Sequence, residues 1–279
     1  MGNYRHKLSS AGCPEVVINK RKSGSSKGET VKKSKKGEVN YCPDPPEGQS
    51  PENMEVKRKI MEAEMQKKDP NHQLIEDLMV STFSQRRKDI VGDQPHITEL
   101  MSRWPALFHE RQTAGGLQTA TKSGKKQPLK DILDCLAKDD TNERRRAAAL
   151  LGLPRYISGE DPSTVIRMCD AHADILDDAM KGMQVGLLIA CEGSEQGAIP
   201  HEVFDVAVVV EETIVLHNIK DVTVGFAMLM GVIYCINLKY PNDMKYSFEF
   251  LQRVVMKISP DQASARVHGL RNKLLRYKL

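Results

Sequence analysis

Residues 203–218 read VFDVAVVVEETIVLHN and carry the clearest structural signal in this chain. Two runs rich in Val and Ile flank Glu211 and Glu212, and β-branched residues on both sides of a short polar pair predict two strands joined as a β-hairpin. The pair lacks the Asn-Gly signal of the tightest hairpin turns. Just upstream, the continuous apolar run QVGLLIAC at 184–191 is typical of a buried strand.

Helical patterns surround these strands. Downstream, the spacing predicts helices over 222–238, 241–258 and 262–275. Upstream, it predicts a helix over 128–140, then one from 142 that Gly152 and Pro154 stop. Residues 160–163, EDPS, then begin a helix whose apolar side carries Val165, Ile166, Met168 and Cys169. The fold class is α+β, with a small antiparallel sheet packed against helices in an α+β domain at 128–279.

A helical segment occupies residues 49–111. Ser50 and Asn71 are good N-caps for its first two helices, and a third runs through ITELMSRW to Pro105. In the first helix Met54, Met61 and Met65 form an apolar stripe, with Ile60 nearby. Either this stripe packs within the chain, or the helix stays available to a partner helix. We interpret Arg86, Arg87 and Lys88 as the solvated face of the second helix.

The N-terminal residues 1–48 form a disordered basic tail and Pro-rich linker, because they have too few large apolar side chains to offset the entropy of ordering. Residues 112–127 are a second linker. The tail's first 40 residues hold ten Lys/Arg and three Asp/Glu, whereas the rest of the chain holds 31 and 34. The basic balance therefore belongs to the tail, and the body lacks the excess positive charge usual in nucleic-acid-binding domains.

The tail has the spacing of a bipartite nuclear import signal. Two basic clusters are separated by a flexible spacer of ten residues, and they comprise Lys20, Arg21, Lys32, Lys33, Lys35 and Lys36. Importins grip such lysine stems on an extended chain, so we expect an importin partner and a nuclear location, with the cytoplasm as the alternative. Weak, non-specific nucleic-acid contact is a second use of the same charge.

No catalytic motif is present, so we expect no enzyme and no cofactor. Cys169 and His172 have zinc-like spacing but lack a second ligand pair, so a core Cys beside a partly exposed His is the better interpretation. Asp205 and Glu211 are reminiscent of metal-dependent nucleases, yet the second strand lacks the required Lys. The longest apolar run, 222–238, is interpreted as a core helix, so we expect no membrane span. Trp104 is interpreted as a core anchor.

Several stretches resemble a protein group that is expanded in fish and labelled sterile alpha motif domain-containing protein-like. They are residues 38–65 and 81–91 in the middle of the chain, and SRWPALF at 102–108, GLPRYISGEDPS at 152–163 and the block from 207 to 254. The chain departs from the group at 112–127, where relatives continue with a helical stretch, and no sterile alpha motif domain is visible in the tail. The resemblance implies no catalytic residues.

Two functions fit these observations. The first is a non-enzymatic protein-interaction module that binds another protein or a second copy of itself and is directed to the nucleus by its tail; the sequence leaves the oligomeric state open. The alternative is a nucleic-acid-associated protein of mobile-element or defence origin that contacts phosphates through the tail.

Overall fold

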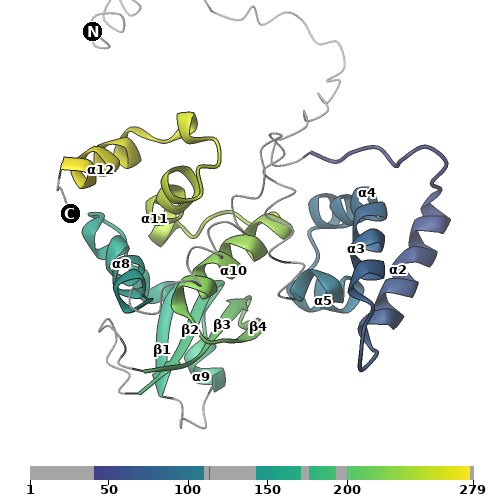
Figure 1. Cartoon of the computed structure of the whole chain (residues 1–279), viewed down its shortest axis with the longest axis horizontal. Coiled ribbons are helices and arrows are strands. Elements are labelled where there is room, and N and C mark those ends of the chain that lie inside the picture. The colour runs from purple at the N-terminus through teal and green to yellow at the C-terminus, as the bar shows by residue number, and fades with distance from the viewer. Residues whose placement is uncertain are drawn as a thin grey trace, which may run out of the picture. The chain divides into compact units, whose positions relative to one another are not determined.

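The computed structural model describes residues 41–109, 113, 143–170, 176–192, 200 and 202–276 (Figure 1). The predicted α+β class is confirmed: helices surround a four-stranded sheet whose strands lie in the order β1-β2-β3-β4. The strands are β1 Ile166–Asp170, β2 Val185–Cys191, β3 Val203–Val210 and β4 Thr213–Ile219.

The predicted hairpin is present. β3 and β4 pair antiparallel, and β2 pairs antiparallel with the other edge of β3. Glu211 and Glu212 form the reversal with φ of 49° and 59°, a left-handed conformation that glycine and asparagine usually occupy. Tertiary contacts hold it: the Glu211 and Glu212 amides donate to the carbonyls of Gln184 and Met183, and the Glu212 carboxylate accepts from the Gly182 amide at 2.6 Å.

The helix predicted to begin at 160–163 is wrong beyond its first turn. A short 3-10 turn at Pro162–Thr164 leads directly into β1, which pairs parallel with β2 and makes the sheet mixed. Ile166 and Met168 face the larger core, whereas Arg167 and Cys169 point to the other face, so the period is two rather than 3.6. Five residues are too few for the sequence to distinguish a helical period from a strand period. The segment forms a strand because it pairs with the free edge of β2.

The two faces of the sheet are covered unequally. Helix α10, Val222–Cys235, packs on one face, where Phe226 and Leu229 meet Leu187 and Val206. Helix α10 is apolar almost all round, as a buried helix must be, and the Asp221 side chain caps it by accepting from the Thr223 amide. On the other face, the short α9, Leu176–Met180, and Met183 cover Leu188, Ala207 and Val209.

Three helices lie against this layer. They are α8 Glu143–Tyr156, α11 Lys245–Phe250, which continues as a π-helical turn through Leu251–Val255, and α12 Ala265–Arg276. Short 3-10 turns at Asn242–Met244 and Pro260–Gln262 precede the last two. The prediction that Gly152 and Pro154 stop α8 is wrong. Pro154 lies in the last turn, so it removes only the one hydrogen bond that an amide there would donate to the carbonyl of Leu150, and the residue is buried.

The segment at 49–111 is helical as predicted. It comprises α2 Pro51–Met65, α3 His72–Ser81, α4 Phe83–Lys88, the π-helical turn Asp89–Asp93, α5 Ile97–Arg103 and the 3-10 turn Pro105–Phe108. Ser50 and Asn71 cap α2 and α3 as expected, accepting from the amides of Asn53 and Leu74. The predicted second helix is divided at Thr82.

One hydrophobic core includes residues of the helical segment and of the sheet layer. Met61, Ile75 and Trp104 belong to the same buried cluster as the residues beneath α10. At the surface, the Glu211 carboxylate accepts from the Ile97 amide at 2.7 Å and lies 3.0 Å from Nε2 of His96. The methionine stripe of α2 therefore packs within the chain. Among the described helices, none is both long and apolar enough to cross a membrane.

Candidate functional site

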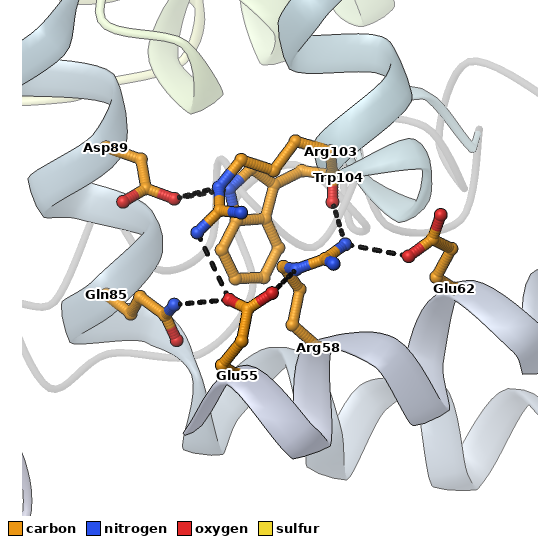
Figure 2. Close-up of polar contacts among 7 residues, drawn as sticks. All are labelled: Glu55, Arg58, Glu62, Gln85, Asp89, Arg103 and Trp104. Carbon is orange, nitrogen blue, oxygen red and sulfur yellow. Dashed lines mark hydrogen bonds and ion pairs between the residues drawn. The ribbon is translucent and has the colours of Figure 1, made fainter. Parts of the chain in front are cut away.

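A continuous polar network joins α2, α4 and α5 (Figure 2). Arg58 of α2 donates from Nε to Glu55 and from Nη1 to Glu62, each at 2.8 Å, and also to the carbonyl of Arg103. Arg103 of α5 then donates from Nε to Asp89 at 2.6 Å and from Nη2 to Glu55 at 3.2 Å. The network thus ties the first helix to the last one of the segment.

Trp104 and Gln85 complete this network. The Trp104 indole donates to Asp89 at 3.0 Å, and the Gln85 amide donates to Glu55 at 2.9 Å. Trp104 is fully buried, which confirms it as a core anchor, and the Arg103 guanidinium lies over its ring. Four charged side chains at the centre of the network each make at least two hydrogen bonds. They are the carboxylates of Glu55 and Asp89, which accept, and the guanidinium groups of Arg58 and Arg103, which donate.

Opposite charges set the protonation of the network. Burial alone would raise the pKa of Glu55, but hydrogen bonds from Arg58 and Gln85 and the charge of Arg103 hold it below its usual value. Burial alone would lower the pKa of Arg103, and Asp89 and Glu55 raise it instead. Both groups are therefore charged at neutral pH, and neither is poised to transfer a proton.

A depression of about 490 Å³ lies beside this network. Its lining residues are polar or charged, namely Arg58, Glu62, Thr98, Glu99, Ser102 and Arg103. Small-molecule pockets are lined mainly by apolar and aromatic side chains, and this depression has no such wall. What the network does in this structure is link α2 to α4 and α5.

The basic cluster at 86–88 does not form the solvated face that we predicted. Arg86 is 7% exposed, and its Nη1 donates to the carbonyl of Met79 at 3.0 Å. Its guanidinium lies over the rings of Phe83 and Trp104, and burial lowers its pKa to about 10. The prediction is wrong for Arg86 because this arginine fills the space between aromatic rings. Only Lys88 of the cluster is exposed.

The outer face of α2 carries an apolar stripe that sequence reasoning missed. Val56 and Ile60 are 56% and 45% exposed, and the exposed Ala63 follows at the same helical spacing. We had placed Ile60 beside the methionine stripe, but it points away from Met54 and Met61. The signal was in the sequence: positions i, i+4 and i+7 form a second stripe of their own. We call Val56, Ile60 and Ala63 the outer stripe.

The structure separates the residues that suggested a metal site. Cys169 lies on β1 and not on a helix, and His172 lies outside the described residues. Asp205 is the third residue of β3 and Glu211 lies in the turn that follows this strand, six residues and so about 20 Å farther along, too far for the two to share an ion. Within the described ranges, no three His, Cys, Asp or Glu side chains are placed to hold a metal.

The cysteines near the sheet behave as small apolar residues. Cys191 is fully buried, Cys235 is partly buried against the core, and burial raises the pKa of Cys235 to about 11. Such thiols are poor nucleophiles at neutral pH. All six residues of the predicted import signal, Lys20, Arg21, Lys32, Lys33, Lys35 and Lys36, lie outside the described residues.

The polar network and the outer stripe both belong to a segment with known relatives. Residues 54–109 match the family model of the helical domain of sterile alpha motif domain-containing protein 3. The segment is similar to that domain, and the resemblance inferred from the sequence is confirmed over these residues. The match begins within α2 and ends after the 3-10 turn that follows Trp104. No curated protein and no solved structure matches the chain.

Proposed function

We propose that this protein is a non-enzymatic protein-interaction module that acts through the outer stripe of α2. One observation carries the proposal. The inner face of α2 is locked into the core by Met54 and Met61 and by the Arg58 network, whereas Val56 and Ile60 point into solvent. A rigid helix with a second apolar stripe is suited to receive the apolar face of another helix.

The charges on this face favour a second copy of the chain as the partner. Glu52 begins the face, and Lys67, two residues past the end of α2 and paired with Glu64 at 2.6 Å, follows it, with the outer stripe between them. Two copies of α2 in antiparallel orientation place Glu52 of each opposite Lys67 of the other. Val56 then meets Ala63 of the other copy, and the stem of Lys59 covers Ile60. This self-complementary pattern is what a two-fold symmetric interface requires.

The resulting dimer is expected to be weak. A standard stable interface buries roughly 1,600 Å², and one pair of helices of this length buries much less. We expect a reversible dimer whose dissociation constant lies at about micromolar or weaker. Such an interface responds to protein concentration, and tethering to a common partner would strengthen it.

Sedimentation velocity of the full chain over a range of concentrations tests the pairing. Ile60→Asp places a charge at the centre of the stripe and is expected to leave only monomer. Val80→Asp is the matched control, because Val80 is 73% exposed on α3 outside the stripe, and this variant is expected to behave as the parent chain.

A charge exchange identifies the second copy as the partner. Glu52→Lys and Lys67→Glu each create two repulsive contacts in their own dimer, so each variant alone is expected to be monomeric. Mixed together, the two variants restore both attractive pairs and are expected to form the heterodimer. A parent chain that stays monomeric at all concentrations, or a mixture that does not associate, overturns the proposal.

We further propose that the basic tail directs the module to the nucleus through an importin. The support is the spacing of Lys20 and Arg21 from the cluster at 32–36. The alternative function, phosphate contact through the same tail, predicts binding that ignores sequence and fades steeply with salt.

A further inference from the structure

Residues of α8, α11 and α12 and of their flanking turns line a small groove; the three helices are labelled in Figure 1. Beneath it, Ile157, Phe250, Val267 and Leu270 form a hydrophobic cluster separate from the main core, and this cluster holds the three helices together. The groove measures about 240 Å³. We call it the basic groove and define it by six of its lining residues: Tyr156, Ser158, Tyr246, Arg266, Gly269 and Lys273.

One stripe of α12 provides the positive charge. Arg266, Gly269, Lys273 and Arg276 recur at i, i+3, i+7 and i+10, so they share one side of the helix, and its cations span about 15 Å. All three cations are exposed, and none pairs with a carboxylate in the part of the chain that the structure describes. Gly269 leaves the centre of the stripe open, since a Cβ there would meet nothing within 4 Å.

The nearby carboxylates form their hydrogen bonds with the starts of helices rather than with these cations. Glu160 accepts from the amides of Tyr246 and Ser247 at the beginning of α11. Glu249 accepts from the amide and hydroxyl of Ser264, just before α12. Residues 239–276, which include α11 and α12, hold eight Lys/Arg against three Asp/Glu, so this part of the chain is basic although the body as a whole is nearly neutral.

Two tyrosines accompany the cations. The Arg266 guanidinium lies over the ring of Tyr246, 4.5 Å from the ring centroid, and this contact holds Arg266 in place. The Lys245 ammonium lies 5.9 Å from the same centroid. Arg266 also donates to the carbonyl of Ser158. Tyr156, at the end of α8, is 55% exposed and has no ring partner among the described residues. An exposed ring beside exposed cations that lack a carboxylate partner, of which Arg266 is held in place, is the kind of surface that single-stranded nucleic acids bind.

We propose that the basic groove binds single-stranded nucleic acid. Arg266, Lys273 and Arg276 contact successive phosphates, and a base stacks on Tyr156. The groove is smaller than the roughly 300–1,000 Å³ of small-molecule pockets and open along α12, so it suits an extended chain. An acidic peptide would satisfy the cations but would leave the tyrosine unused. This activity is independent of the proposed pairing through α2 and of the basic tail.

Fluorescence anisotropy with a labelled oligothymidylate, its oligouridylate counterpart and a duplex of equal length tests the proposal on the full chain. At about 0.15 M salt, R266Q/K273Q/R276Q is expected to weaken single-strand binding by at least about tenfold. Because three phosphate contacts are lost, the slope of log K against log salt should fall by about 2. Tyr156→Ala is expected to weaken single-strand binding several-fold and to leave duplex binding unchanged.

Substitutions at Gly269 keep the test valid if the triple variant folds poorly. The open space there accepts a side chain, so G269E is expected to weaken binding and G269K to strengthen it, with G269A close to the parent. The control K68Q/K88Q/K220Q removes three exposed charges elsewhere and is expected to bind within about twofold of the parent chain. A second control, K32Q/K33Q/K35Q/K36Q, removes four charges from the tail and is expected to keep single-strand binding.

Three results overturn the proposal. One is binding that the triple variant and G269E leave unchanged. Another is binding that the tail substitutions abolish, which would assign all affinity to the tail. The third is competition by poly-glutamate as strong as that by the oligonucleotide, which would make the groove a docking site for acidic proteins.

Discussion

The same residue types serve two purposes in this molecule, and their neighbours decide which. Arg58 and Arg103 lie among Glu55, Glu62 and Asp89, so their charges are neutralised and they stabilise the packing of helices. Arg266 and Lys273 lie where the nearest carboxylates accept from backbone amides instead. Their charges are therefore available to a ligand.

Glu55 makes the helical segment sensitive to acid. Its pKa lies below the usual value in the folded state, so its contribution to stability is complete above about 4.5 and is lost as the pH falls through the lower folded-state value. We expect Glu55→Gln to lower the free energy of unfolding at neutral pH by about 1–2 kcal/mol and to make stability less dependent on pH in the acid range. Thermal unfolding followed by circular dichroism from neutral pH to below 4.5 measures both effects.

Glu76→Gln is the matched control for this measurement. Glu76 is exposed on α3 and its side chain makes no hydrogen bond to a described residue, so the stability curve of Glu76→Gln should follow that of the parent. Equal pH profiles for Glu55→Gln and the parent chain would show that the network does not contribute as we describe.

At the scale of elements, two helical glycines have opposite roles. Gly225 lets α10 approach the sheet, because a Cβ there would lie 2.6 Å from Cγ1 of Val206. Gly269 in α12 faces open space. Alanine favours a helix by about 1 kcal/mol over glycine at either site, but only at Gly225 does it also force the helix from the sheet.

Alanine substitutions at these glycines should therefore change stability in opposite directions. We expect Gly225→Ala to lower the free energy of unfolding by about 1–3 kcal/mol through overpacking, and Gly269→Ala to raise it by about 0.5–1 kcal/mol. Urea denaturation of the two variants and of the parent chain shows whether each substitution raises or lowers the free energy of unfolding. A stabilised Gly225→Ala would mean that α10 lies farther from β3 than the structure shows.

At the scale of the whole molecule, the proposed surfaces belong to different elements. The outer stripe lies on α2, the basic groove on α8, α11 and α12, and the import signal in the tail. A dimer through α2 would carry two grooves, so self-association would raise the affinity for a long single strand without any new contact.

The import proposal is tested on the intact chain in cells. A fluorescent fusion with Lys32, Lys33, Lys35 and Lys36 changed to Ala is expected to lose nuclear accumulation, because the larger cluster of the signal is removed. The control changes Lys59, Lys68 and Lys88 to Ala and should accumulate as the parent fusion does. A fusion that enters the nucleus equally well without the tail lysines contradicts the proposal.

Local period and capping chemistry act over a few residues, so the sequence was enough to predict the α+β class, the hairpin of β3 and β4 and the caps Ser50 and Asn71. It was also enough for the resemblance that the family match confirms at 54–109. The strand at 166–170 follows only from the folded chain, because five residues have no clear period and the parallel pairing comes from β2. It alone buried Arg86 among aromatic rings, exposed Ile60 and left Arg266 and Lys273 unpaired, because burial and charge balance depend on which distant side chains meet.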